Sequence, residues 1–238
     1  MLIDSSHVTT IAVLSSAPYD KSPLYTDLEA RKIVERIRRS KRRDHFSLVH
    51  QTAVRPQVLR QVLLDYKPHI IHFSGHGSAD GLFFQGEGHT SHLVTTESFV
   101  GLFVLFAEPL KCIVLNACHS RKQIVALAKH TKRFVIGMNG LVEDEWAIEF
   151  ATGFYDALGA GADIPFAYRL GCNAVELAGG NRATLPTLSG PPGLQFKRSA
   201  KPCVTHRRRR IRSGVRRISC CVDVASLRAA DRPQLLPE

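Results

Sequence analysis

Five short apolar runs, rich in β-branched residues, recur along the chain and set narrow limits on its fold. Apolar and polar residues do not alternate within these runs, so each would form a strand that is buried on both faces. Strands of this kind are typical of parallel sheets that are covered by other elements on both sides. The five predicted strands comprise residues 10–14, 46–49, 70–73, 112–115 and 134–136.

The segments between these runs carry the periodicity and the boundary residues of helices. Ser22 followed by Pro23 is typical of a helix start, and the spacing of apolar residues extends this helix to Ile37. Ser120 with Gln123 predicts a capping box that opens another helix. We expect helices over about 22–37, 56–66, 97–106, 120–130, 144–158 and 163–178, the last two ended by left-handed glycines at 159 and 179, and a small hairpin at 81–85.

Alternation of buried strands with helices predicts an α/β fold with right-handed crossovers. We therefore expect an open, mostly parallel sheet with helices on both faces. A length of 238 residues suits one main domain, which we place at residues 1–190. Beyond about residue 187 the pattern gives way to Pro and Gly and then to an arginine-rich stretch, so residues 191–238 are predicted to be a Pro/Gly linker and a disordered basic tail.

The net charge of +11 is unevenly distributed along the chain. Residues 191–238 carry +9, whereas residues 1–190 carry +2. Binding of nucleic acid through the tail, with the arginines at 207–210 on the phosphates, is therefore one open interpretation. No aromatic residues are interleaved with these arginines, which favours a solvated tail over a nucleic-acid site.

The cysteines and the apolar content argue against export and against metal binding. The six cysteines form no CxxC pair and no regular framework, so a reducing cytoplasm suits the chain better than a secreted disulfide scaffold. The N-terminus lacks the features of a signal peptide, and the apolar stretch 99–107 is well below the ~20 residues of a membrane span. The cysteines and histidines lack compact ligand spacing, so we predict no metal site, no membrane contact and a cytoplasmic location.

Two of the predicted strands end in residues that can perform chemistry. The third run is followed by His76, which stands between two glycines, and the fourth run is followed by Asn116, Ala117 and Cys118. In an open parallel sheet, ligands bind beyond the carboxyl ends of the strands. If the two strands are neighbours, about 4.8 Å apart, His76 and Cys118 lie side by side at one edge of the sheet.

Cys118 has two features that favour a reactive thiolate. The imidazole of His76 can accept the thiol proton, and a helix that opens at Ser120 would present its positive end to the sulfur. The backbone N–H groups of Gly77 and Cys118 could point at a developing oxyanion. A single Cys or His at such a position is more often a structural residue. Strand ends, flanking glycines and a following helix start occur together here, and this combination favours catalysis.

Beyond these two strand ends, the sequence resembles the CHAT domain, a family of caspase-like peptidases related to separase, metacaspase and clostripain. The resemblance covers about residues 8–188 and rests first on the HG and NAC motifs at the two strand ends. The similar segments read "AVRPQVLRQVLL", "PHIIHFSGHG", "IVLNAC", "FVIGMNG", "DEWAIEFATGFYDALGAG" and "AYRLGCNAVEL".

The resemblance implies a caspase-like cysteine endopeptidase that cleaves a protein substrate with a dyad of His76 and Cys118, in a bacterial regulatory, stress or defence pathway. It also implies oxyanion donors at Gly77 and Cys118, and neither a metal nor another cofactor. Metacaspases, which prefer basic P1 residues, have Asp two places before the nucleophile, where this chain has Asn116. Asn116 and Asp144 are our candidate substrate-binding residues, although Asp144 could instead stabilise the first turn of a helix.

Two other functions stay open from the sequence. One is a caspase-like module that no longer cleaves and acts by docking to other proteins, and the other is nucleic-acid binding through the tail. CHAT domains often occur beside repeat or ATPase modules, so we also expect a regulatory partner that carries such a module.

Overall fold

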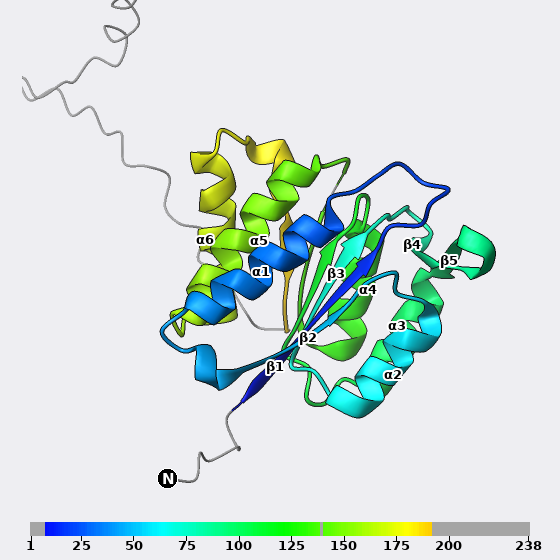
Figure 1. The fold of residues 1–238 in the computed structure, drawn as a ribbon, viewed down its shortest axis with the longest axis horizontal. Coiled ribbons are helices and arrows are strands. Elements are labelled where there is room, and N and C mark those ends of the chain that lie inside the picture. Colours follow the sequence, from blue (N-terminus) through cyan, green and yellow to red (C-terminus); the bar gives the residue numbers. More distant parts are fainter. Residues whose placement is uncertain (1–7, 139, 192–238) are drawn as a thin grey trace, which may run out of the picture. The chain divides into compact units, whose positions relative to one another are not determined.

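The computed structural model describes residues 8–138 and 140–191. These residues form a six-stranded sheet in the order β2-β1-β3-β6-β7-β8, in which β8 runs antiparallel to β7 and the other neighbours are parallel (Figure 1). The prediction of an open, mostly parallel α/β sheet is confirmed. The strands comprise β1 (Thr9–Ser16), β2 (Phe46–Gln51), β3 (Ile70–Gly75), β6 (Cys112–Asn116), β7 (Phe134–Gly137) and β8 (Thr187–Ser189).

Helices cover both faces of the sheet, as predicted (Figure 1). Because successive strand residues point to opposite faces, Ile11 and Val13 of β1 pack against one helical layer, while Ala12 and Leu14 pack against the other. Both sets are fully buried, which explains why the run is apolar without alternation. One layer contains α1 (Thr26–Arg39), α5 (Asp144–Gly159) and α6 (Ile164–Leu177), and the other contains α2 (Pro56–Tyr66), α3 (Thr96–Leu105) and α4 (Arg121–Thr131).

The two edge strands differ from the prediction. β2 is not buried on both faces, since Ser47 and His50 are exposed at the edge of the sheet. β8 was not predicted, because a strand of three residues leaves no recognisable pattern and forms only by pairing with β7. The four central strands are buried on both faces as predicted, except at Thr10 of β1 and Phe134 of β7, which are half-buried.

Two helices begin and end within one residue of their predicted limits. α2 begins at Pro56 and ends before Lys67, which takes a left-handed conformation (φ 42°) just ahead of a proline. α6 begins after Asp163, whose carboxylate accepts the backbone N–H of Phe166 at 2.8 Å. It is followed by Gly179 with φ 103°, the left-handed glycine that the sequence predicts.

The predicted start of α1 is wrong. The helix begins at Thr26 rather than at Ser22, because residues 22–25 run in an irregular conformation along the edge of the site described below. The predicted left-handed glycine at the end of α5 is displaced as well. Gly159 lies within α5, and Gly161 takes the positive φ of 91°.

The predicted capping box at the start of α4 is also wrong, although the helix starts where it was expected. The Ser120 hydroxyl accepts the backbone N–H of Met138 at 2.9 Å and donates to the Met138 carbonyl at 3.2 Å. The Gln123 amide donates to the Ser78 carbonyl at 3.1 Å. Both side chains are buried, so they bind other segments of the chain instead of capping their own helix.

The predicted hairpin forms a separate two-stranded sheet beside the end of β3. β4 (Gly81–Gln85) pairs antiparallel with β5 (Ser91–Thr95), so residues 81–85 are its first strand rather than the whole hairpin. The backbone N–H of Phe83 donates to the His76 carbonyl at 3.0 Å. This bond attaches the hairpin to the segment that follows β3.

From residue 192 on, the predicted linker and basic tail lie outside the described residues, so the tail and the domain limits 1–190 and 191–238 stay predictions. Within the described ranges, no helix has both the length and the apolar character needed to cross a bilayer.

Helices α5 and α6 approach each other closely where Gly153 of α5 faces Gly171 of α6. A Cβ built on Gly153 would lie 2.8 Å from the Cβ of Ala174 and 2.9 Å from the carbonyl oxygen of Leu170. Real side chains do not come so close, so the two helices must separate to admit a methyl group at this position.

We expect Gly153→Ala to lower the free energy of unfolding by about 1–3 kcal/mol, because overpacking outweighs the better helix propensity of alanine. Gly101→Ala is the matched control, since a Cβ on this exposed residue of α3 meets nothing within 4 Å. It should raise the free energy of unfolding by roughly 0.5–1 kcal/mol. Urea unfolding of both variants measures the difference, and changes of the same sign would contradict the packing argument.

Candidate active site

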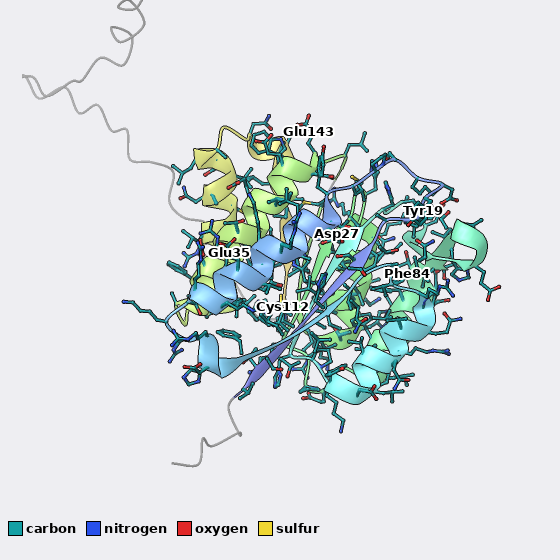
Figure 2. The ribbon with its side chains drawn as sticks, in the orientation of Figure 1. Tyr19, Asp27, Glu35, Phe84, Cys112 and Glu143 are labelled. Carbon is teal, nitrogen blue, oxygen red and sulfur yellow. The ribbon has the colours of Figure 1, made fainter. Side chains whose placement is uncertain are left out.

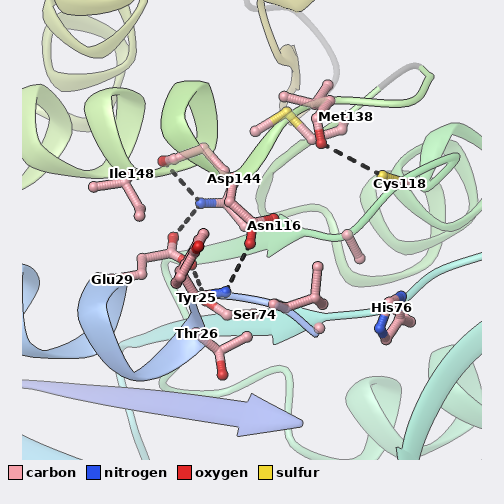
Figure 3. Close-up of a pocket in the computed structure, with 15 residues that line it drawn as sticks. Tyr25, Thr26, Glu29, Ser74, His76, Asn116, Cys118, Met138, Asp144 and Ile148 are labelled. Atoms are coloured by element: carbon pink, nitrogen blue, oxygen red, sulfur yellow. Dashed lines mark hydrogen bonds between the residues drawn. The ribbon is translucent and has the colours of Figure 1, made fainter. Parts of the chain in front are cut away.

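β3 and β6 are adjacent and parallel, and their register sets Ser74 opposite Asn116. The chain continues two residues beyond each of these positions, to His76 on one strand and to Cys118 on the other. Both residues line one pocket at the carboxyl edge of the sheet (Figure 3). The structure thus brings the two predicted dyad residues to the same site.

The ring of His76 is held by a backbone carbonyl. Its Nε2 lies 2.8 Å from the carbonyl oxygen of Ser22. A carbonyl oxygen can only accept a hydrogen bond, so this contact requires a proton on Nε2. In the neutral ring Nδ1 is then the acceptor, which is the state that a general base needs.

Cys118 stands between the end of β6 and the start of α4. Its thiol is partly exposed and donates to the carbonyl oxygen of Val142, 3.8 Å away (Figure 3). Ser120, the N-cap of α4, lies two residues further along the chain, so the N-terminal end of this helix begins close to Cys118. His119 between them has a left-handed conformation (φ 56°), which turns the chain sharply at this point.

Gly77 allows the two strand ends to touch. A Cβ built on Gly77 would overlap the carbonyl oxygen of Cys118, so the site admits no side chain at this position. Within residues 8–138 and 140–191, the backbone N–H groups of Gly77 and Cys118 donate to no acceptor. Both predicted oxyanion donors are therefore available to a ligand in the described part of the chain.

A buried carboxylate that the sequence analysis missed lies beneath the pocket. Glu29 of α1 is 4% exposed, and its Oε1 lies 2.8 Å from Nε2 of His72. Its Oε2 accepts a hydrogen bond of 2.5 Å from the Ser74 hydroxyl, and the Asn116 amide also donates to Oε1 (Figure 3). The other ring nitrogen of His72 lies 3.2 Å from the Tyr155 hydroxyl. This cluster ties α1 to β3, β6 and α5.

Two signals in the sequence could have revealed the cluster. Glu29 lies four and eight residues before Ile33 and Ile37, so it falls on the buried face of its helix. His72 interrupts an otherwise apolar run that is buried on both faces. A charged or titratable residue in each of two buried patterns indicates a buried pair.

The electrostatics of the cluster favour a charged Glu29. Burial alone would raise the pKa of Glu29. The charge and the hydrogen bond of His72, together with the hydrogen bonds from Ser74 and Asn116, lower the pKa and outweigh burial. The pKa of Glu29 is therefore held below its ordinary value. Glu29 is therefore a carboxylate that is paired with His72 beneath the pocket.

Asn116 and Asp144, the predicted substrate-binding residues, both line the pocket. The Asn116 amide donates to Glu29 and to the Ala147 carbonyl (3.2 Å), while its Oδ1 has no partner among the described residues. Asp144 is the first residue of α5, and its Oδ2 accepts the backbone N–H of Tyr25 at 2.7 Å. Contact with substrate stays a prediction for both residues.

Two further cysteines in the described ranges are poorer candidates for a nucleophile. Cys112 is fully buried in the core, where burial raises the pKa of its thiol far above the ordinary value (Figure 2). Burial raises the pKa of Cys172 to about 11. No group of three or more His, Cys, Asp or Glu in the same ranges is arranged to hold a metal ion.

We expect Glu29→Gln to lower the free energy of unfolding at neutral pH by about 3 kcal/mol, because His72 loses its charged partner in the interior. The pKa of Glu29 is lower in the folded protein than in the unfolded chain, so its charge stabilises the wild type above about pH 4.3. That stabilisation is lost as the pH falls through the lower, folded value.

Urea unfolding from about pH 2 to pH 7 should therefore give a shallower pH dependence for Glu29→Gln than for the wild type. Glu35→Gln is the control, since it removes a half-exposed carboxylate that pairs with Arg39 on the same helix. A Glu29→Gln variant with the wild-type pH dependence would show that the cluster is not charged.

Comparisons with known proteins identify relatives of this chain. Two curated relatives are a "Probable protease" from Gillisia limnaea, 24% identical over 74% of this chain and 32% of its own length, and a "Roc-COR-CHAT protease" from an unknown prokaryotic organism, 26% identical over 70% of this chain and 16% of its own length. This chain thus spans a third or less of each relative.

A solved structure shares the fold. The crystal structure of caspase-1 from Spodoptera frugiperda superposes with a TM-score of 0.52 at 12% identity, over 78% of this chain and 87% of the caspase chain. The family model of the CHAT domain matches residues 12–169, which include both β3 and β6 with the residues that follow them. With a caspase-like fold and a family match over most of its length, this chain belongs to the CHAT domain family.

Proposed function

We propose that this chain is a cysteine endopeptidase domain in which Cys118 is the nucleophile and His76 is the general base. One observation carries the proposal: the pairing of β3 with β6 brings both residues to one pocket, where the Ser22 carbonyl holds the proton of His76 on Nε2. A partly exposed thiol and a base in the matching tautomer are the two groups that acyl transfer requires.

In the proposed reaction, Nδ1 of His76 takes the thiol proton while Sγ of Cys118 attacks the carbonyl carbon of the scissile peptide. The hydrogen bond from the thiol to Val142 breaks in this step. The substrate carbonyl oxygen becomes an oxyanion, which the N–H groups of Gly77 and Cys118 stabilise. The C–N bond then breaks, and His76 gives its proton to the leaving amine.

The second half of the reaction releases the enzyme from its thioester. The same His76 ring takes a proton from water, which attacks the thioester carbonyl carbon. The C–S bond breaks, the carboxylic acid product leaves, and the thiol of Cys118 regains its proton.

The names of the two curated relatives support peptidase activity. Because this chain spans 32% and 16% of their lengths, the activities, substrates and partners of those whole proteins are proposals here. We propose a protein substrate in a bacterial regulatory, stress or defence pathway. The multidomain name of one relative supports the proposal of a regulatory partner, and the repeat or ATPase modules of that partner stay a prediction.

The pocket beside the dyad is our candidate for the site that binds the P1 side chain. Asn116 and Asp144 present oxygen acceptors to it, and no Lys or Arg is among the described residues that line it. An acceptor-rich wall favours P1 side chains that can donate hydrogen bonds. Asn116, whose Oδ1 has no partner among the described residues, is the residue to which such a donor would bind.

An electrophilic peptide library varied at P1 tests the proposal. We expect covalent labelling of the wild type at Cys118, no labelling of Cys118→Ala at this peptide, and labelling at least about 100-fold slower in His76→Ala. Cys172→Ala is the matched control and should be labelled like the wild type. Circular dichroism and urea unfolding establish that each variant is folded.

The same variants decide between cleavage and docking. If Cys118→Ala abolishes cleavage of a cellular protein target, the chain is a peptidase, whereas an unchanged biological effect in this variant would indicate an interaction module that does not cleave. Removal of residues 191–238 should leave labelling of Cys118 unchanged. If that deletion instead removed a salt-dependent affinity for nucleic acid together with the biological effect, the tail would be the functional part.

A further inference from the structure

Residues 17–25, which join β1 to α1, form a strap along the pocket. In Figure 1 this dark blue segment reaches toward the β4–β5 hairpin before it returns to α1. Leu24 and Tyr25 line the pocket itself. The strap has no regular secondary structure, and Pro18 is its single buried residue. Apolar packing therefore holds the strap weakly, and its position depends on polar contacts.

One end of the strap is fastened to the hairpin. The carboxylate of Asp20 accepts the backbone N–H of Ser91 at 3.0 Å and the Ser91 hydroxyl at 2.9 Å. The ammonium group of Lys21 lies 4.3 Å from the ring centre of Phe83. The hydrogen bond from the Ser91 backbone holds the pKa of Asp20 below its ordinary value, so Asp20 is a carboxylate across the neutral range.

The other end of the strap is fastened to α5. Oδ2 of Asp144 accepts the backbone N–H of Tyr25 at 2.7 Å, just before the first turn of α1. The Ser22 carbonyl, which binds Nε2 of His76 at 2.8 Å, stands between these two fastenings. The acceptor that orients His76 thus belongs to an exposed segment that carboxylates hold on either side.

We propose that Asp144 and Asp20 are positioning residues, which hold the strap so that the Ser22 carbonyl orients His76 toward Cys118. This inference rests on the proposed dyad. A hydrogen bond from a charged imidazolium to a carbonyl is stronger than one from a neutral ring, so a well-placed Ser22 carbonyl favours the pair of thiolate and imidazolium. When the contact of Asp20 with Ser91 or that of Asp144 with Tyr25 is lost, the Ser22 carbonyl moves and its hydrogen bond to His76 weakens.

Asp144 could act by holding the strap or by placing its negative charge near the substrate. One substitution distinguishes these two roles. Asp144→Asn keeps an oxygen that can accept the Tyr25 N–H but removes the negative charge. Asp144→Ala removes both. If Asp144 acts by positioning the strap, Asp144→Asn retains the wild-type reactivity of Cys118. If its charge is what matters, Asp144→Asn loses that reactivity as Asp144→Ala does.

The rate of Cys118 alkylation by iodoacetamide tests the proposal without a known substrate. Mass spectrometry of the peptide that carries Cys118 measures the rate between about pH 5 and pH 9.5, because the rate follows the thiolate fraction. We expect Asp144→Ala and Asp20→Ala each to slow alkylation at pH 7 by roughly three- to ten-fold, the value of one hydrogen bond. Their pH–rate profiles should move toward higher pH and meet the wild-type profile at the alkaline end of the range, where cysteine thiols in general are ionised.

Two variants serve as controls in the same experiment. Asp144→Asn should restore the wild-type profile. Glu145→Ala removes an exposed acid from the same first turn of α5, next to Asp144, and should also leave the profile unchanged. Thermal unfolding checks that the slower variants remain folded at the temperature of the assay.

A wild-type rate and profile in Asp144→Ala would overturn the proposal. A loss in Asp144→Asn as large as the loss in Asp144→Ala would also overturn it, since the charge itself would then be the active feature. His76→Ala separates this inference from the proposed dyad: if that variant is alkylated like the wild type at every pH, the dyad fails, whatever the strap does.

Discussion

The parallel pairing of β3 with β6 is the constraint on which the site depends. Parallel strands deliver their carboxyl ends to one edge of a sheet, and the register of Ser74 opposite Asn116 brings both extensions to the same level. His76 and Cys118 then need only short continuations to share a pocket. Gly77 completes the arrangement, because a side chain there would collide with the backbone of Cys118.

The cluster around Glu29 connects this edge to the helical layer of α1, α5 and α6. Glu29 binds the hydroxyl of Ser74 and the amide of Asn116, the paired residues that precede the site on the two strands. A buried ion pair is weak evidence for stability compared with an apolar core, yet the loss of one partner is strongly destabilising. The cluster therefore fixes where α1 sits on the sheet, and with it the point where the strap ends.

The proposed reactive groups lie at the ends of buried strands, whereas the carbonyl that orients His76 lies in an irregular, exposed segment. The proposed nucleophile, base and oxyanion donors come within two residues of the ends of two buried strands, which anchor them to the core. The carbonyl that orients His76 belongs instead to an exposed strap that polar contacts hold at both ends. A site of this design can lose its alignment without any loss of the fold, which makes the strap the part most open to influence from other domains or partners.

The central strands, most of the helices and the two strand ends that carry His76 and Cys118 could be predicted from the sequence, because hydrophobic period and the residues after a strand are local properties. Other features depend on contacts between distant segments, which a local sequence pattern does not reveal. The start of α1 moved from Ser22 to Thr26, Ser120 and Gln123 became long-range ligands, and β8 formed by pairing with β7. The buried Glu29 cluster and the bond between Ser22 and His76 join residues more than forty positions apart, so their energies exist only once the sheet has brought those segments together.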